Sequence, residues 1–311
     1  MTVDTVSDLD RFLFERHEDH RRELFEFLRI ASVSTQPEHS ADVGRAAEWV
    51  KAALERIGLR ARVHKTQGHP IVVGEWREAP NAPTVLVYGH YDVQPPEPFD
   101  QWQSPPFEPE LRDGRIYARG AMDDKGQLFL QMKALEAHLA VRGTLPVNIV
   151  FIAEGEEEIG SDNLLQFIRD ERDTIGADAT VISDSAMFAP GIPSILASLR
   201  GVSYMQIDVR GPSADLHSGS YGGAVINPAT ELSRLLASLH GDNGRIAVDG
   251  FYDRVREWEP DVLAQMRELP FDDEGFRAET GAPALGGESG FTTLERLWTR
   301  PTCDVHGFLS G

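Results

Sequence analysis

The sequence predicts an α/β protein in which helices pack on a largely parallel β-sheet. Short apolar runs of strand length alternate with longer segments whose apolar residues recur at helical spacing, which is the pattern of parallel α/β sheets. Three apolar runs, at residues 84–88, 147–153 and 180–183, are each followed by a histidine or by carboxylates. After about residue 201 glycine-rich loops and helical segments dominate, so we expect a second domain over residues 202–311, inserted into a first domain over residues 1–201.

The first elements follow from spacing and from helix-end signals. A helix is expected over residues 8–30, and a second one from its N-cap Ser40 to Gly58, because glycine suits the left-handed position that follows a helix. Strands are expected at 61–65 and at Ile71–Trp76, before the run at 84–88.

The later elements are predicted in the same way. A helix over residues 126–142 precedes the apolar strand at 147–153, and residues 160–162 open another helix. Alternating residues at 202–209 predict a half-buried strand. Asn227 and Pro228 provide an N-cap and a first-turn proline for a helix that ends near His240.

Ligand-type side chains gather where the strands are expected to end. His90 and Asp92 follow the first run, the acidic segment 154–161 follows the second, and Asp184 follows the third, while the pair Asp123 and Asp124 precedes a helix. Taken singly, these residues could cap turns or form a solvated acidic face. In adjacent parallel strands they would meet in one crevice, and imidazole and carboxylate groups there suit a zinc-like ion.

The net charge, the cysteine content and the lack of long apolar runs indicate which partners and which compartment to expect. The formal net charge of −20 argues against nucleic acid and anionic membranes as partners. The single cysteine, Cys303, cannot form an internal disulfide, which suits a reducing compartment. No apolar run approaches the ~18 residues of a membrane span, and the acidic N-terminus does not resemble a signal peptide. A cytoplasmic location is therefore expected.

Several motifs, in order along the chain, resemble those of the M20 metallopeptidases. The segments 92–109 and 114–126 are most similar to the branch of cytosolic non-specific dipeptidases and carnosinases. The motifs are HxDV at 90–93, RGxxDDKG at 119–126, EGxEExGS at 154–161, SD at 183–184 and DLHSG at 215–219.

The resemblance implies a fold and a set of metal ligands. The fold is a three-layer αβα catalytic domain over 1–201 with a smaller α+β lid or dimerisation domain over 202–311, incomplete here. Two divalent ions are implied, zinc first, with manganese or cobalt as alternatives. His90 and Asp184 would hold one ion, Asp123 would bridge to the second, and Glu158 would bind the second.

The resemblance also implies the chemistry, which is hydrolysis of dipeptides or short peptides. Glu157 would act as the general base for a hydroxide held between the two ions, and Asp92 would orient His90. His217 would stabilise the oxyanion from the partner subunit of a homodimer. The peptide bond between Asp123 and Asp124 is expected to be cis.

One departure from the family pattern changes the expectation for activity. The last histidine, His306, lies in a segment that resembles the family's second domain, not its terminal metal ligand. We therefore expect an N-terminal portion of a longer enzyme that is weak or inactive alone. An N-acyl amino acid deacylase and a non-catalytic metal-binding or dimerisation fragment remain as alternatives. Glu157 beside Glu158 favours an enzyme.

Overall fold

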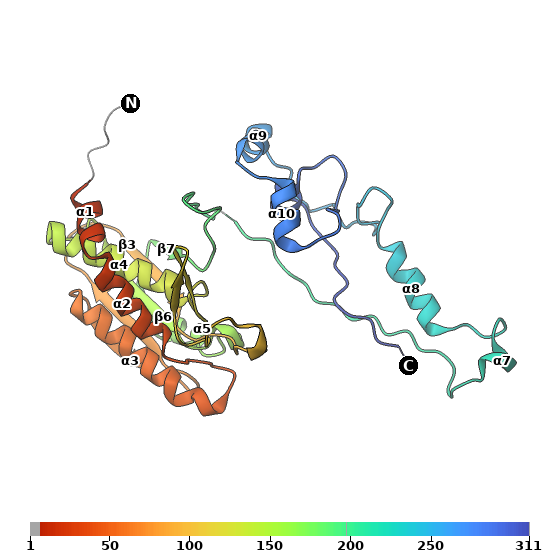
Figure 1. Ribbon diagram of the computed structural model, residues 1–311, viewed down its shortest axis with the longest axis horizontal. Coiled ribbons are helices and arrows are strands. Elements are labelled where there is room, and N and C mark those ends of the chain that lie inside the picture. Colours follow the sequence, from red (N-terminus) through yellow and green to blue (C-terminus); the bar gives the residue numbers. More distant parts are fainter. Residues whose placement is uncertain (1–6, 197, 311) are drawn as a thin grey trace. The chain divides into compact units, whose positions relative to one another are not determined.

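The chain forms two compact units in the computed structural model, which describes residues 7–196 and 198–310. One unit extends to Ser194 and the other begins at Ile195, and each is described by itself (Figure 1). This division falls a few residues before the boundary predicted at residue 201. The catalytic and lid roles of the two parts stay predictions.

The first unit is organised around a sheet whose order is β1-β2-β6-β3-β7 in the described residues. Strand β3 pairs in parallel with both β6 and β7, whereas β2 is antiparallel to β1 and β6. The short β1–β2 connection requires that antiparallel pairing, so the predicted mainly parallel sheet is confirmed with one strand reversed. The strands are β1 (Arg60–His64), β2 (Ile71–Trp76), β3 (Thr84–His90), β6 (Asn148–Glu154) and β7 (Ala179–Ile182).

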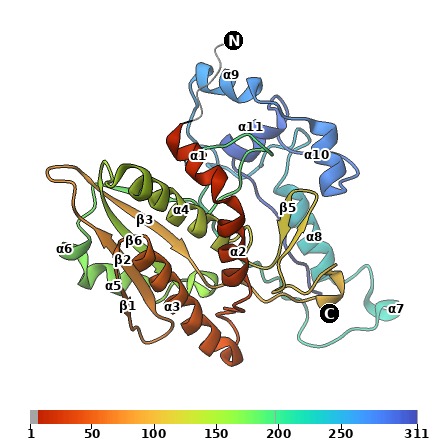
Figure 2. The same ribbon diagram turned by 60° about the vertical axis from the view of Figure 1, so that its left-hand side comes forward.

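Helices cover both faces of this sheet, which gives the three predicted layers (Figures 1 and 2). Buried residues of α2, α3 and α4 pack on one face, and those of α5 and α6 pack on the other. A separate hairpin is formed by β4 (Glu110–Arg112) and β5 (Arg115–Tyr117). The helices are α1 (Asp8–Glu15), α2 (His17–Leu28), α3 (Ser40–Arg56), α4 (Lys125–Arg142), α5 (Leu164–Asp170) and α6 (Arg172–Ile175).

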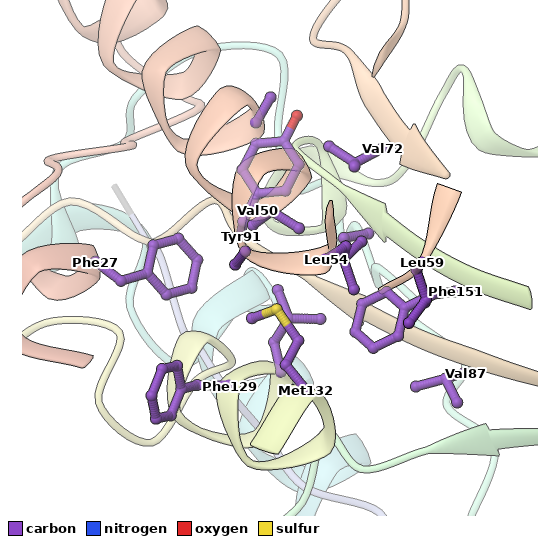
Figure 3. Close-up of a cluster of buried hydrophobic side chains, with 14 of the residues drawn as sticks. Phe27, Val50, Leu54, Leu59, Val72, Val87, Tyr91, Phe129, Met132 and Phe151 are labelled. Carbon is purple, nitrogen blue, oxygen red and sulfur yellow. The ribbon is translucent and has the colours of Figure 1, made fainter. Parts of the chain in front are cut away.

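The larger core packs strand β6 against α3 and α4. Phe151 of β6, Leu54 of α3 and Met132 of α4 are buried in one cluster (Figure 3). The rings of Phe27 and Trp49 stack with centroids 4.2 Å apart. Removing such side chains from water supplies most of the drive to fold, and it also holds the end of β6, where the acidic segment begins.

The long helix predicted over residues 8–30 is divided in two. Arg16, at φ −104° and ψ 6°, leaves the helical conformation between α1 and α2, and this bend lets both helices pack against α4. A capping box of Ser7 and Asp10 begins α1. Ser40 is the first residue of α3 and not its N-cap, while Gly58 adopts the expected left-handed conformation, with φ of 100°.

The second unit consists of helices and loops within residues 198–310. Asn227 Oδ1 accepts from Thr230 N at 3.0 Å and Pro228 is the first helical residue, as predicted. The strand predicted at 202–209 does not form, because no strand of this described part offers it a backbone partner, and Tyr204 is 83% exposed. The helices are α7 (Ser218–Tyr221), α8 (Pro228–Ser238), α9 (Pro260–Glu268), α10 (Asp273–Thr280) and α11 (Thr293–Thr299).

No helix of the described residues is long and apolar enough to cross a membrane.

A buried ion-pair network makes the second unit sensitive to acid. Glu288 is 8% exposed and accepts hydrogen bonds from Arg245 at 2.9 Å and from Arg300 at 2.8 and 3.0 Å. Burial alone would raise the pKa of Glu288, but the hydrogen bonds and charges of Arg300 and Arg245 outweigh it and lower that pKa. A depressed carboxyl pKa stabilises the fold above the pKa of the unfolded chain, and this stabilisation is lost as the pH falls through the folded pKa.

We expect Glu288→Gln to destabilise the second unit by about 1–3 kcal/mol at pH 7, because a charged hydrogen-bond acceptor is lost. The difference between parent and variant should shrink as the pH falls below the ordinary glutamate range. Urea unfolding of both proteins at pH 7 and pH 3 measures this difference. An equal difference at both pH values would contradict the assignment.

Candidate metal centre

The carboxyl ends of three adjacent strands meet at one edge of the sheet. His90 is the last residue of β3 and lies opposite Glu154, the last residue of β6. Strand β7 pairs in parallel on the other side of β3, and Asp184 follows two residues after its end. The prediction that these strand ends share one edge is therefore confirmed.

His90 lies at the centre of this edge and is fully buried. Its Nδ1 is 3.0 Å from the carbonyl oxygen of Asp92 and 3.3 Å from Asp92 Oδ1. Its Nε2 is 3.0 Å from Asp123 Oδ1, 3.7 Å from Asp184 Oδ2 and 3.9 Å from Glu157 Oε2. One ring nitrogen thus faces a fixed acceptor, and the other faces carboxylates from three separate loops.

Among the described residues, two overlapping groups of side chains could hold metal ions. One consists of His90, Asp123 and Asp184, and the other of His90, Glu157 and Glu158; within each group the ligand atoms lie within 4.8 Å of one another. Imidazole nitrogen with carboxylate oxygens is a donor set that suits zinc, manganese or cobalt. The residues therefore fit divalent cations.

Asp92 connects the two sides of the centre. It is fully buried, and its Oδ1 and Oδ2 accept from the backbone N–H groups of Glu157 at 3.2 Å and Glu158 at 3.1 Å. The sequence suggested only that Asp92 would orient His90. The bonds to the acidic loop were missed, because a backbone donor leaves no mark in the sequence.

The acidic segment after β6 does not form one solvated face. Glu154 is buried, and its Oε1 accepts from Tyr88 Oη at 2.5 Å and from Ser161 Oγ at 2.8 Å. Glu157 and Glu158 instead begin a 3₁₀ turn and belong to the group around His90. The segment therefore combines glutamates that hold the loop with glutamates that can bind a ligand.

The Asp123–Asp124 peptide bond is cis, as expected. Asp124 is buried, and its Oδ2 accepts from the backbone N–H of His90 at 3.1 Å. The neighbouring Lys125 is fully buried, and its Nζ donates to the carbonyl oxygen of Ile30 at 2.6 Å. Burial lowers the pKa of Lys125 to about 7. These contacts fix the start of α4 beside the metal centre.

Negative charge is concentrated around one imidazole. Burial alone would lower the pKa of His90, but the hydrogen bond and charge of Asp92 raise it to about 10, with further contributions from Asp124 and Glu157. Burial raises the pKa of Asp124 to about 7, although His90 opposes this. Burial and neighbouring carboxylates also raise the pKa values of Glu157 and Glu158. A bound cation would compensate this excess of negative charge.

His217 belongs to the second unit. It is exposed and caps α7, where its Nδ1 accepts from the backbone N–H of Gly219 at 3.0 Å. Its role in catalysis stays a prediction.

Comparisons with known proteins give a family and relatives. Residues 86–281 match the model of peptidase family M20/M25/M40. The chain is 35% identical over 293 residues to the Cys-Gly metallodipeptidase dug1 of Schizosaccharomyces pombe, covering 90% of this chain and 62% of that protein. It is also 35% identical over 299 residues to the Beta-Ala-His dipeptidase of Homo sapiens, covering 91% and 59%. The chain thus spans about three-fifths of the length of these relatives.

Solved structures agree with this likeness. The dipeptidase Dug1p of Saccharomyces cerevisiae matches with a TM-score of 0.72 and 26% identity, over 99% of this chain and 68% of that one. The M20 family metallo-carboxypeptidase Sso-CP2 of Sulfolobus solfataricus matches with a TM-score of 0.75 and 33% identity, over 94% and 66%. The similarity therefore extends through both units of the chain.

Proposed function

Because the chain belongs to peptidase family M20/M25/M40, we propose that the protein is a dinuclear metal-dependent dipeptidase with Glu157 as its general base. The observation that carries the proposal is the position of His90 Nε2, which faces Asp123, Asp184 and Glu157 within 3.9 Å. One imidazole and several carboxylates that converge on it form a set of metal ligands. In a surface ion pair, each carboxylate would instead face a basic side chain.

The ligands would divide between two ions. His90 and Asp184 would hold one ion, Glu158 would hold the other, and Asp123 would bridge them. Zinc is the first choice, with manganese or cobalt as alternatives. When bound, such ions lower the pKa of a coordinated water and polarise the carbonyl of the substrate.

Glu157 would move the protons. Its side chain is 38% exposed, so a substrate can approach it, while the bond from its backbone N–H to Asp92 fixes its position. The carboxylate would take a proton from the attacking water and deliver it to the leaving amine. Asp92 would hold the Nδ1 side of His90, which leaves Nε2 for a metal.

The dipeptide class is supported by the relatives, whose names specify Cys-Gly and β-Ala-His dipeptides. A carboxypeptidase is the second candidate, because one structural neighbour carries that name. Purified protein should be assayed with Cys-Gly, β-Ala-His, a longer peptide with a free C-terminus and an N-acetyl amino acid. Turnover of the dipeptides alone would support the proposal, and turnover of the N-acetyl compound alone would replace it by a deacylase.

We also propose that the protein is a homodimer formed through its second unit and that His217 of one subunit stabilises the oxyanion in the other. An oxyanion requires donors fixed before the reaction begins, and the α7 cap holds the His217 ring in place. Sedimentation equilibrium separates a dimer from a monomer, and a monomer would refute this part.

Metal content tests the centre directly. After removal of metal with a chelator and reloading at neutral pH, we expect two ions per chain by elemental analysis. Asp123→Asn should bind about one ion or none, because the bridging carboxylate becomes a neutral amide. Equal metal content in both proteins would contradict the role of Asp123, and no metal in the parent would contradict the dinuclear proposal.

A further inference from the structure

We propose that Glu156 is a positioning residue that clamps the loop carrying Glu157 and Glu158 to the turn between β1 and β2. The inference rests on the proposed function, because the groups it positions are the proposed base and a proposed ligand. It concerns a glutamate that the acidic motif alone does not distinguish from its neighbours.

The contacts of Glu156 reach in two directions. Its side chain is buried, and Oε1 accepts from the backbone N–H of His69 at 2.7 Å. Oε2 accepts from Asn163 Nδ2 at 2.8 Å and from Asn163 N at 3.3 Å. Its backbone oxygen accepts from Ile159 N and Ser161 N at 3.1 and 2.8 Å. One residue therefore ties together both ends of the loop and a distant turn.

The turn is a firm anchor for this clamp. Thr66 Oγ1 donates to the carbonyl oxygen of His69 at 2.7 Å and accepts from Gly68 N at 3.0 Å. His69 Nε2 lies 3.3 Å from the carbonyl oxygen of Ser34. The turn is closed by its own hydrogen bonds. It can therefore keep its position, and hold the Glu156 carboxylate, even if the loop moves.

Glu156 and Asp92 anchor the same loop to two separate segments, the β1–β2 turn and the segment after β3. Asp92 accepts from the N–H groups of Glu157 and Glu158, and Glu156, the residue just before them, is bound to the turn through His69 N–H. If either carboxylate were removed, the base and the ligand could move by a fraction of an ångström, which is enough to weaken a metal site. A residue that only filled the core would not need a carboxylate with donors from two segments.

Gly68 offers a way to disturb the clamp without removing any of its groups. A β-carbon at this exposed glycine would overlap Glu156 Oε1 and would also approach Asn163 Nδ2 to 2.9 Å. Gly68→Ala should therefore displace the carboxylate. Gly44→Ala is the matched control, because a β-carbon there meets nothing within 4 Å.

The experiment measures binding of Co²⁺ by its visible absorption and, separately, thermal unfolding of the metal-free proteins. We expect Glu156→Ala and Gly68→Ala each to weaken binding of the Glu158-side ion about tenfold, and the double variant to lose no more than Glu156→Ala alone. Glu156→Gln, which keeps an acceptor for His69 N–H, should lose less than Glu156→Ala. Gly44→Ala should bind as the parent does.

Parental Co²⁺ affinity in Gly68→Ala and Glu156→Ala would overturn the inference, whatever their melting temperatures. Losses that add in the double variant would also overturn it, because the two changes would then act separately. If the parent itself binds no Co²⁺, the proposed function fails, and the inference fails with it. Binding by the parent therefore separates the two failures.

Discussion

Glutamine in place of Glu157 should reduce kcat for dipeptide hydrolysis by about 10²–10⁴-fold, the usual contribution of a general acid–base group. The amide has nearly the same shape but cannot accept a proton from water. Its backbone N–H can still donate to Asp92, so the loop should keep its position. Metal content, measured by elemental analysis beside the kinetics, should stay at the parental value.

Glu158→Gln is the matched control, because it makes the same change one residue later on the same turn. This variant should lose activity together with one metal ion, since Glu158 is proposed as a ligand. The two side chains belong to the same candidate group around His90. Activity and metal content, measured in both variants, are therefore needed to tell the general base from the metal ligand. If Glu157→Gln loses the ion and Glu158→Gln keeps it, the assignments of base and ligand must be exchanged.

The position of the centre could be predicted from the sequence because strand ends carry a local signal. His90 and Asp184 each follow an apolar run, and parallel pairing of β3 with its neighbours places such ends at one edge. The division of labour within the acidic segment could not be predicted. Its glutamates have no helical or strand period, and the 3₁₀ turn at Glu157–Ile159 decides which of them face the centre.

The two elements that were predicted wrongly also depend on contacts between residues far apart in the sequence. Local spacing describes residues 8–30 as one helix, but packing on α4 decides the bend at Arg16. Local alternation describes 202–209 as a strand, but a strand also needs a backbone partner, and the described residues of the second unit provide none. Signals that depended on neighbouring residues alone, such as the Asn227 cap, were predicted correctly.

Asp92→Ala should weaken metal binding about 10–100-fold and lower the free energy of unfolding by about 3 kcal/mol. The carboxylate is fully buried and accepts from the backbone N–H groups of Glu157 and Glu158, and its Oδ1 also lies 3.3 Å from His90 Nδ1. Alanine leaves the two backbone N–H groups without their acceptor, which frees the acidic loop to move, and it removes the negative charge beside His90, whose Nδ1 keeps only the backbone carbonyl oxygen of residue 92. Isothermal titration with Zn²⁺ and urea unfolding of the metal-free protein measure the two effects.

Asp178→Ala separates metal positioning from general destabilisation. Asp178 Oδ2 accepts from the backbone N–H of Thr84 at 2.7 Å, so it is also an aspartate that holds a backbone donor of β3, but at the opposite end of that strand from His90. We expect this control to lose some stability and to keep parental affinity for Zn²⁺. Equal losses of affinity in the two variants would mean that Asp92 acts only through the stability of β3. A selective loss in Asp92→Ala would show that one buried carboxylate sets the geometry of both the histidine and the glutamate side of the centre.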